Sequence, residues 1–173
     1  MSLGPPLSAA EAAIFETMVV SRYMHVFGRP AVAMLIPSQG AVIGQLTCRT
    51  GYPAEEIAQR VPGCSLTGVD SSPAALELAR TKAQLPNGLT TSYLHADSVP
   101  TPLPSGAFTH TLSLHPSGKL GDYTALFAEH YRLLCEGGQM VVSLPLRGSY
   151  PEIYDMLREY ALRYDQPHFG ASV

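Results

Sequence analysis

The chain lacks several features that define large classes of proteins. Its 173 residues include only three cysteines, Cys48, Cys64 and Cys135, which form no paired framework, so we expect a reduced, cytoplasmic protein. The six histidines have no metal-ligand spacing, and we expect no metal site. No apolar run reaches the ~18 residues of a membrane span, and no signal peptide is visible. The net charge of −3 argues against a nucleic-acid binder.

The composition that remains is that of a globular domain, with 46% hydrophobic and 14% charged residues. Ser8 with Glu11 three residues later predicts a capped N-terminal helix. We expect this helix to end near Gly28 and a shorter helix to begin at Pro30. The sequence therefore predicts an N-terminal helical segment over residues 1–30 and an α/β domain over 31–173.

Apolar stretches alternate with helical patterns along this domain, which is typical of a doubly wound, mostly parallel sheet. Five strands are predicted, over residues 41–46, 66–70, 90–95, 107–114 and 139–144. Helices are predicted over residues 53–60, 74–82, 120–134 and 151–164. The third of these helices is expected to end at a glycine stop, Gly137-Gly138.

The most informative motif is the turn after the first strand, Leu-Thr-Cys-Arg-Thr-Gly-Tyr at residues 46–52. A strand, a tight turn, a helix and a second strand ending in Asp70 form the usual frame of a nucleotide site. This arrangement resembles the class I S-adenosylmethionine (SAM)-dependent methyltransferases. Their first strand and turn read roughly Val-Leu-Asp-Leu-Gly-Cys-Gly-Thr-Gly, and residues 43–51 read Ile-Gly-Gln-Leu-Thr-Cys-Arg-Thr-Gly.

The resemblance implies SAM as the cofactor and assigns roles to matched positions. Asp70 matches the acid that binds the ribose hydroxyls, and Asp97 matches the residue at the adenine edge. The first turn contributes four further positions, which are Gln45, Thr47, Arg49 and Gly51. Each acid also has a purely structural alternative, because Asp70 could cap the following turn and Asp97 could stabilise its loop.

Three departures from the family pattern fall within the first turn. Gln45 lacks the charge that the family's acid offers to the methionine ammonium, and Thr47 and Arg49 replace glycines. Arg49 would also bring a positive charge near the sulfonium. Two like charges ~4 Å apart repel by about 4 kcal/mol at an effective dielectric near 20. We therefore expect a degenerate, non-catalytic domain that acts as a binding or regulatory module.

Two other functions are compatible with the same residues. One is an active SAM-dependent methyltransferase with an atypical glycine loop, acting on a small molecule or a protein. The other is a binder of a different anionic, nucleotide-like ligand, held by Arg49 with Thr47 and Thr50 at a helix N-terminus. A dinucleotide oxidoreductase is disfavoured, because the chain contains no Gly-x-Gly-x-x-Gly.

Three further side chains are weaker candidates. Cys48 lies near a helix N-terminus, where a thiolate is favoured, but packing is the expected role. His115 follows the fourth strand and could act as a general base, although a loop histidine is the simpler interpretation. His110 is expected to face out of its strand or to pack at a sheet edge.

The family sheet has the strand order 3-2-1-4-5-7-6, and its last two strands form a hairpin. No apolar run remains for that hairpin after residue 164, so we expect it to be missing, or the chain to be part of a longer protein. The fifth strand, Gln139 to Leu144, would then be a bare edge. Such an edge tends to be covered by another chain, so we predict a protein partner or a homodimer there.

Overall fold

The computed structural model describes residues 2–82, 88–114, 123–144 and 151–164. Its centre is a parallel five-stranded sheet in the order β3-β2-β1-β4-β5. The strands are β1 (Val42–Leu46), β2 (Ser65–Asp70), β3 (Thr90–His95), β4 (Phe108–Leu114) and β5 (Leu134–Ser143). The other elements are α1 (Ala9–Ile14), the π-helical η1 (Phe15–Met24), α2 (His25–Ala33), α3 (Ala54–Arg60), α4 (Pro73–Thr81), α5 (Thr124–Leu133) and α6 (Pro151–Tyr164).

The sheet holds together because its central strands bury apolar side chains on both faces, as parallel strands do. On one face, Ile43 and Leu66 pack with Ile57 of α3 in a cluster that also includes residues of α2. On the other face, Leu46 and Val69 pack with residues of α5. The strand order confirms the doubly wound α/β fold predicted from the sequence, and all five predicted strands are present.

The N-terminal helix differs from the prediction. The capping box of Ser8 and Glu11 is present, but α1, η1 and α2 follow one another without a break from Ala9 to Ala33. The predicted end at Gly28 and restart at Pro30 are therefore wrong, and the boundary predicted at residues 30/31 falls inside α2. The helix continues through Gly28. A glycine is needed at this position because the ring of Tyr52 fills the space where a side chain would lie.

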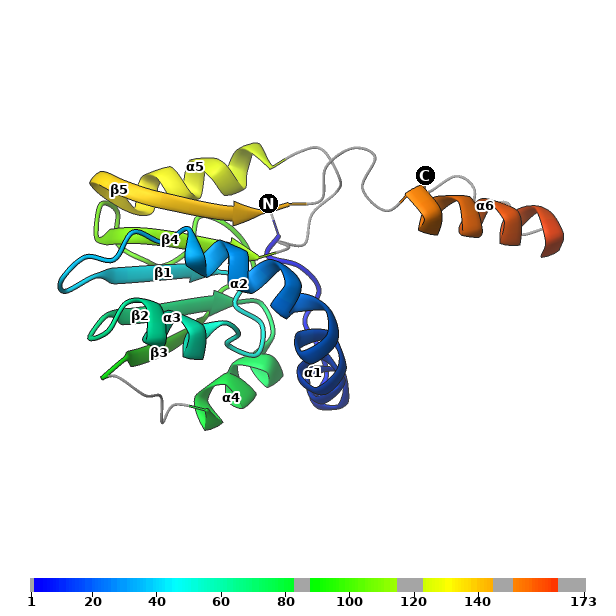
Figure 1. The fold of residues 1–173 in the computed structure, drawn as a ribbon, viewed down its shortest axis with the longest axis horizontal. Helices are drawn as coiled ribbons and strands as arrows, with labels where there is room; N and C mark the ends of the chain where they lie inside the picture. Colours follow the sequence, from blue (N-terminus) through cyan, green and yellow to red (C-terminus); the bar gives the residue numbers. More distant parts are fainter. Residues whose placement is uncertain (1, 83–87, 115–122, 145–150, 165–173) are drawn as a thin grey trace.

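The helical segment from Ala9 to Ala33 runs from the carboxyl ends of the strands onto one face of the sheet. Figure 1 shows α1 beside the ends of the strands to which the arrowheads point, with α2 continuing across β1 and β4. Beyond α2, the side chain of Gln139 in β5 accepts a hydrogen bond from Ile36 N at 3.0 Å and donates one to Met34 O at 2.9 Å. The chain after the helix is therefore fastened to the edge strand.

The predicted glycine stop after α5 is also wrong. α5 ends at Leu133, and the chain enters β5 at Leu134 without a glycine cap. Phe108 pairs with Leu134 and His110 with Gln139, so four residues of β5 lie opposite Thr109 alone. Gly137, with φ +72°, lies in this irregularity. The glycines therefore form a bulge within β5, and regular pairing begins at Gln139 as predicted.

β5 is an edge of the sheet in the described residues, and no further strand follows it there. Figure 1 shows α6 apart from the sheet, and Met156 and Tyr160 on this helix are exposed. No helix in the described ranges is long and apolar enough to cross a membrane.

Candidate cofactor site

The first turn keeps the backbone shape of a glycine loop. The backbone angle φ is +56° at Thr47, +48° at Arg49 and +85° at Gly51. These values lie in the left-handed region, which costs a residue with a side chain about 1 to 2 kcal/mol. The turn therefore holds the main-chain conformation of its family pattern even though two of the three residues have side chains.

Asp70 lies at the end of β2, directly opposite this turn, and it is fully buried. Its Oδ2 accepts a hydrogen bond from Arg49 N at 2.9 Å, and its Oδ1 accepts one from Ser72 N at 2.9 Å. The Arg49 guanidinium lies 3.5 Å from Oδ1. Both oxygens of the predicted ribose acid are therefore engaged by the protein itself.

The Arg49 side chain extends from the turn toward Asp70. Its Nη1 also donates a hydrogen bond to Pro5 O at 3.0 Å, so the guanidinium joins the first turn, the end of β2 and the N-terminal segment. The positive charge predicted near the sulfonium is paired with a carboxylate in this arrangement. This pairing reduces the like-charge repulsion expected from the sequence.

The remaining residues of the turn face the protein interior. Gln45 is buried, and its Nε2 donates to Tyr52 O at 2.7 Å, while its Oε1 has no hydrogen-bond partner in the described residues. The Thr47 hydroxyl donates to Leu46 O at 2.6 Å and lies 3.1 Å from the Ser113 hydroxyl of β4. One unsatisfied oxygen thus remains at the position of the family's acid.

The second predicted acid has the opposite environment. The Asp97 side chain is 85% exposed and lies 3.3 Å from Nε2 of His95, whose ring also contacts Ser71 O at 3.2 Å. The backbone oxygen of Asp97 accepts a hydrogen bond from Leu3 N at 3.0 Å. The structure thus places both acids after neighbouring strands, with Asp70 enclosed and Asp97 open to solvent.

The weaker candidates have structural roles or lie outside the described residues. His115 is in the range 115–122, which the structure does not describe. His110 is buried rather than facing out, and its ring lies 2.8 Å from both Thr109 Oγ1 and Ile36 O. Burial, together with the nearby Asp70 charge, raises the pKa of Cys48 well above its ordinary value, so this thiol packs as a thiol.

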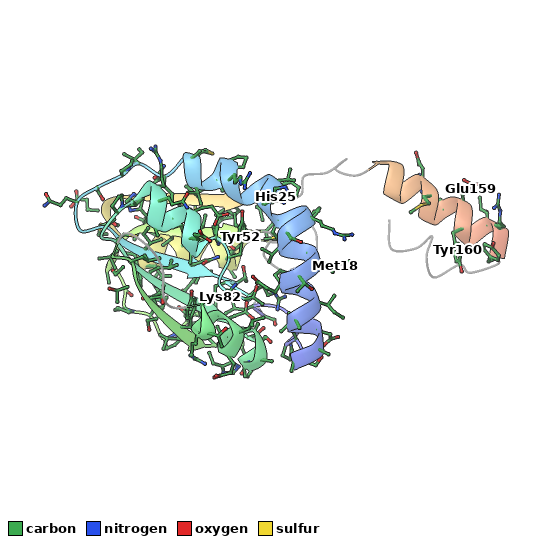
Figure 2. The ribbon with its side chains drawn as sticks, turned by 60° about the horizontal axis from the view of Figure 1, so that its bottom comes forward. Met18, His25, Tyr52, Lys82, Glu159 and Tyr160 are labelled. Carbon is green, nitrogen blue, oxygen red and sulfur yellow. The ribbon has the colours of Figure 1, made fainter. Side chains whose placement is uncertain are left out.

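A cavity of about 640 Å³ lies on the helical side of the turn. It is lined by residues of η1, α2, the turn, α3 and the end of α4, which include Glu16, His25, Tyr52, Glu55, Glu56 and Lys82. Figure 2 labels His25, Tyr52 and Lys82 among them. Lys82 is paired with Glu16 at 2.9 Å. Arg49 and Asp70 do not line this cavity, so it is separate from the predicted ribose position.

Sequence reasoning missed the residues that surround Asp70. Ser71 donates through its hydroxyl to Gly4 O at 2.7 Å, and Ser72 bonds to both backbone atoms of Leu7. The helix-capping role of Ser72 was readable from Ser72-Pro73. Its contact with a segment 65 residues away had no sequence signal.

Comparisons with known proteins agree with this geometry. The profile of a family described as a methyltransferase domain matches residues 43–138, which is more than half of the chain. The chain belongs to this methyltransferase family. The fold is that of the class I, SAM-dependent methyltransferases.

The individual relatives share a third or less of their aligned residues with this chain. This methyltransferase-family chain is 33% identical over 129 residues to a demethylmenaquinone methyltransferase of Thermus thermophilus, which covers 73% of this chain and 58% of the relative. It is 29% identical over 127 residues to the enzyme of that name from Deinococcus radiodurans, covering 72% of this chain and 51% of the relative. The chain thus spans little more than half the length of these curated relatives.

Two solved structures illustrate the shared fold. A Haloferax volcanii putative methyltransferase in complex with the activator Trm112 has a TM-score of 0.67 at 22% identity, covering 79% of this chain and 59% of that one. Geranyl diphosphate methyltransferase in complex with SAM has a TM-score of 0.57 at 19% identity, covering 99% and 71%. At these identities the likeness concerns the fold alone.

The predicted ribose position is enclosed in this structure. The carboxylate expected to accept the ribose hydroxyls is fully buried and accepts from Arg49 N and Ser72 N. The side chain of Arg49 and the N-terminal segment lie beside it. No group of three His, Cys, Asp or Glu side chains that could hold a metal occurs in the part of the chain that the structure describes.

Proposed function

We propose that this methyltransferase-fold domain is a non-catalytic binding or regulatory module of the cytoplasm. The observation that carries the proposal is the enclosure of Asp70, whose two oxygens accept from Arg49 N and Ser72 N beneath the Arg49 guanidinium. Each oxygen of this carboxylate already accepts one hydrogen bond from the protein, so a ribose hydroxyl would have to share an oxygen with Arg49 N or Ser72 N. Each hydrogen bond from a ribose hydroxyl to this carboxylate that is not made weakens SAM binding by about 1.5 to 3 kcal/mol.

Calorimetric titration with SAM and with its demethylated product tests this proposal. We expect dissociation constants no tighter than about 1 mM, or roughly −4 kcal/mol. The triple variant Gln45→Asp, Thr47→Gly, Arg49→Gly should bind at least tenfold more tightly, because the backbone turn already has glycine-type angles. Arg49→Lys is the matched control, since it retains the charge. Low-micromolar binding of SAM to the unmodified chain would contradict the proposal.

An active SAM-dependent methyltransferase with a small-molecule or protein acceptor is the second candidate. Two observations favour it: the similarity to enzymes named demethylmenaquinone methyltransferase, and the unpaired Gln45 Oε1, an acceptor suited to an ammonium. Transfer of a labelled methyl group from SAM to demethylmenaquinone, measured with the full chain, tests it. Turnover that the Asp70→Asn variant abolishes would support this candidate over the first.

Binding of another anionic, nucleotide-like ligand through Arg49 has less support. The guanidinium already contacts one carboxylate and one backbone oxygen, so an incoming anion must compete with Asp70. Titration with ATP measures this competition directly. Binding that is lost in Arg49→Lys would favour the anion site, because Lys lacks the planar fork that recognises phosphate.

We also propose that a second copy of the chain pairs with the outer edge of β5. Regular pairing of this strand with β4 runs from Gln139 to Ser143, and Met140 on it is 42% exposed. An apolar strand edge favours addition of another strand, and a charge on it opposes this addition. Light scattering should detect a dimer that Met140→Lys weakens and that Tyr131→Lys, on the exposed surface of α5, does not. A strict monomer at high concentration would exclude the homodimer.

A further inference from the structure

The N-terminal segment, residues 2–7, lies over the ends of the first three strands and bonds to the loop after each. Leu3 N donates to Asp97 O after β3 at 3.0 Å, and the Ser71 hydroxyl after β2 donates to Gly4 O at 2.7 Å. The Arg49 guanidinium after β1 donates to Pro5 O at 3.0 Å. Three neighbouring strand ends therefore each supply one partner to consecutive residues of this segment.

Leu7, the last residue of the segment, makes two hydrogen bonds to the protein. Ser72 Oγ accepts a hydrogen bond from Leu7 N at 2.9 Å and donates one to Leu7 O at 3.0 Å, so both backbone groups of Leu7 are satisfied. Short antiparallel bridging between Ser2 and Ser98 extends the contact at the other end. These contacts use the main chain of the segment, so they recognise a peptide backbone more than any particular polar side chain.

One side chain adds an apolar anchor. Leu3 is fully buried and packs in the same cluster as Leu46, Val69 and Phe108 of the sheet. Removing this leucine side chain from water stabilises the bound position of the segment through the hydrophobic effect. Main-chain hydrogen bonds combined with one buried side chain are a common mode of peptide recognition.

We propose that the strand ends around Arg49, Ser71 and Ser72 form a binding site for a peptide main chain, and that residues 2–7 are its ligand within the chain. Arg49 contributes to binding in this site, because its guanidinium contacts both the buried Asp70 carboxylate and the backbone oxygen of Pro5. The site uses the same edge of the sheet that the family uses for its cofactor. This inference extends the proposed function by naming what the edge binds.

Amide hydrogen exchange in the full chain, followed by NMR, tests whether the segment is bound. Leu7 N should be protected in the unmodified chain, and Leu3→Asp should accelerate its exchange at least tenfold by expelling the anchor. The core amides of Ile43 and Leu66 should exchange as before, which separates release from unfolding. Leu162→Asp, at a site 86% exposed, is the matched control and should change none of these rates.

Leu3→Ala serves as a milder second variant and should accelerate Leu7 exchange by a smaller factor. Rapid exchange of Leu7 N in the unmodified chain, or no acceleration in either Leu3 variant, would overturn the proposal.

Rebinding in trans tests the site itself. A fluorescent peptide of residues 1–8 should bind saturably to the Leu3→Asp chain and at least tenfold more weakly to the unmodified chain, whose site is filled. The same peptide carrying Leu3→Asp should also bind at least tenfold more weakly. An absence of saturable binding, or equal binding of the two peptides, would refute the peptide site.

Titrating SAM into the Leu3→Asp chain separates this inference from the non-catalytic proposal. Micromolar SAM binding that competes with the labelled peptide would support the peptide site while contradicting a domain unable to bind the cofactor. Peptide binding with no SAM binding would support both.

Discussion

His130 provides a pH-dependent test of how the sheet and α5 pack. Its side chain is fully buried, and neither ring nitrogen has a hydrogen-bond partner in the described residues. Burial lowers the pKa of His130 from 6.5 to about 4, against the opposing charge of Glu129. A charged imidazole at this position would lack the solvation that water provides, so the folded protein holds it neutral.

The sign of the effect follows from the two pKa values. Between pH 6.5 and about 4 the unfolded chain binds more protons at His130 than the folded chain does. The stabilisation is therefore present above pH 6.5 and is lost as the pH falls. A difference of this size corresponds to about 3 kcal/mol in full, most of which should be lost by pH 4.5. That is a large part of a typical domain's 5 to 15 kcal/mol.

Urea denaturation at pH 7.5, 6.5, 5.5 and 4.5 measures this loss as a change in the free energy of unfolding. His130→Leu replaces the titrating group with an apolar side chain, so the variant should lose about 2 to 3 kcal/mol less than the wild type over this pH range. Phe127→Leu, a substitution without a titrating group on the same helix, is the matched control and should keep the wild-type slope. If His130→Leu shows the same slope as the wild type, the imidazole is not buried as described.

Two further predictions concern packing and a buried carboxylate. Gly28→Ala should lower the free energy of unfolding by about 1 to 3 kcal/mol, because its new methyl group meets the ring of Tyr52, and Tyr52→Ala in the same chain should make the combined loss less than additive. Burial opposes ionisation of Glu129, yet hydrogen bonds from Arg132 and Thr101 lower its pKa below 4.5 overall. Glu129→Gln should therefore lower the free energy of unfolding by about 1 to 3 kcal/mol at pH 7, measured by urea denaturation. This difference from the wild type should shrink as the pH falls below 4.5 through the lowered pKa. A difference that stays constant with pH would contradict a stabilising role for the ionised Glu129 carboxylate.

The sequence predicted the parts of this structure that depend on local pattern. The apolar runs gave the five strands, and the capping box of Ser8 was readable because its partner Glu11 is three residues away. The turn after β1 was identified through Asp70, which follows at the family spacing. These features involve short separations or a strong repeating pattern.

What the sequence did not predict depends on contacts between distant residues. The hydrogen bond of Arg49 to Pro5 spans 44 residues, and that of Ser71 to Gly4 spans 67. Neither Pro5 nor Gly4 belongs to a recognisable motif, because their contribution is a backbone oxygen. Gly28 was misread for a related reason: a glycine that makes room for Tyr52 looks the same in sequence as one that ends a helix.

The long helix from Ala9 to Ala33 is fastened at both of its ends. Before it, Leu7 is bonded to Ser72 at the end of β2; after it, the chain at Met34 and Ile36 is bonded to Gln139 on the edge strand. Tilting this helix as one body would strain the contacts at both ends. We therefore expect that a chain which draws Gln139 away from Met34 and Ile36 would also loosen the contacts of the N-terminal segment with Ser72.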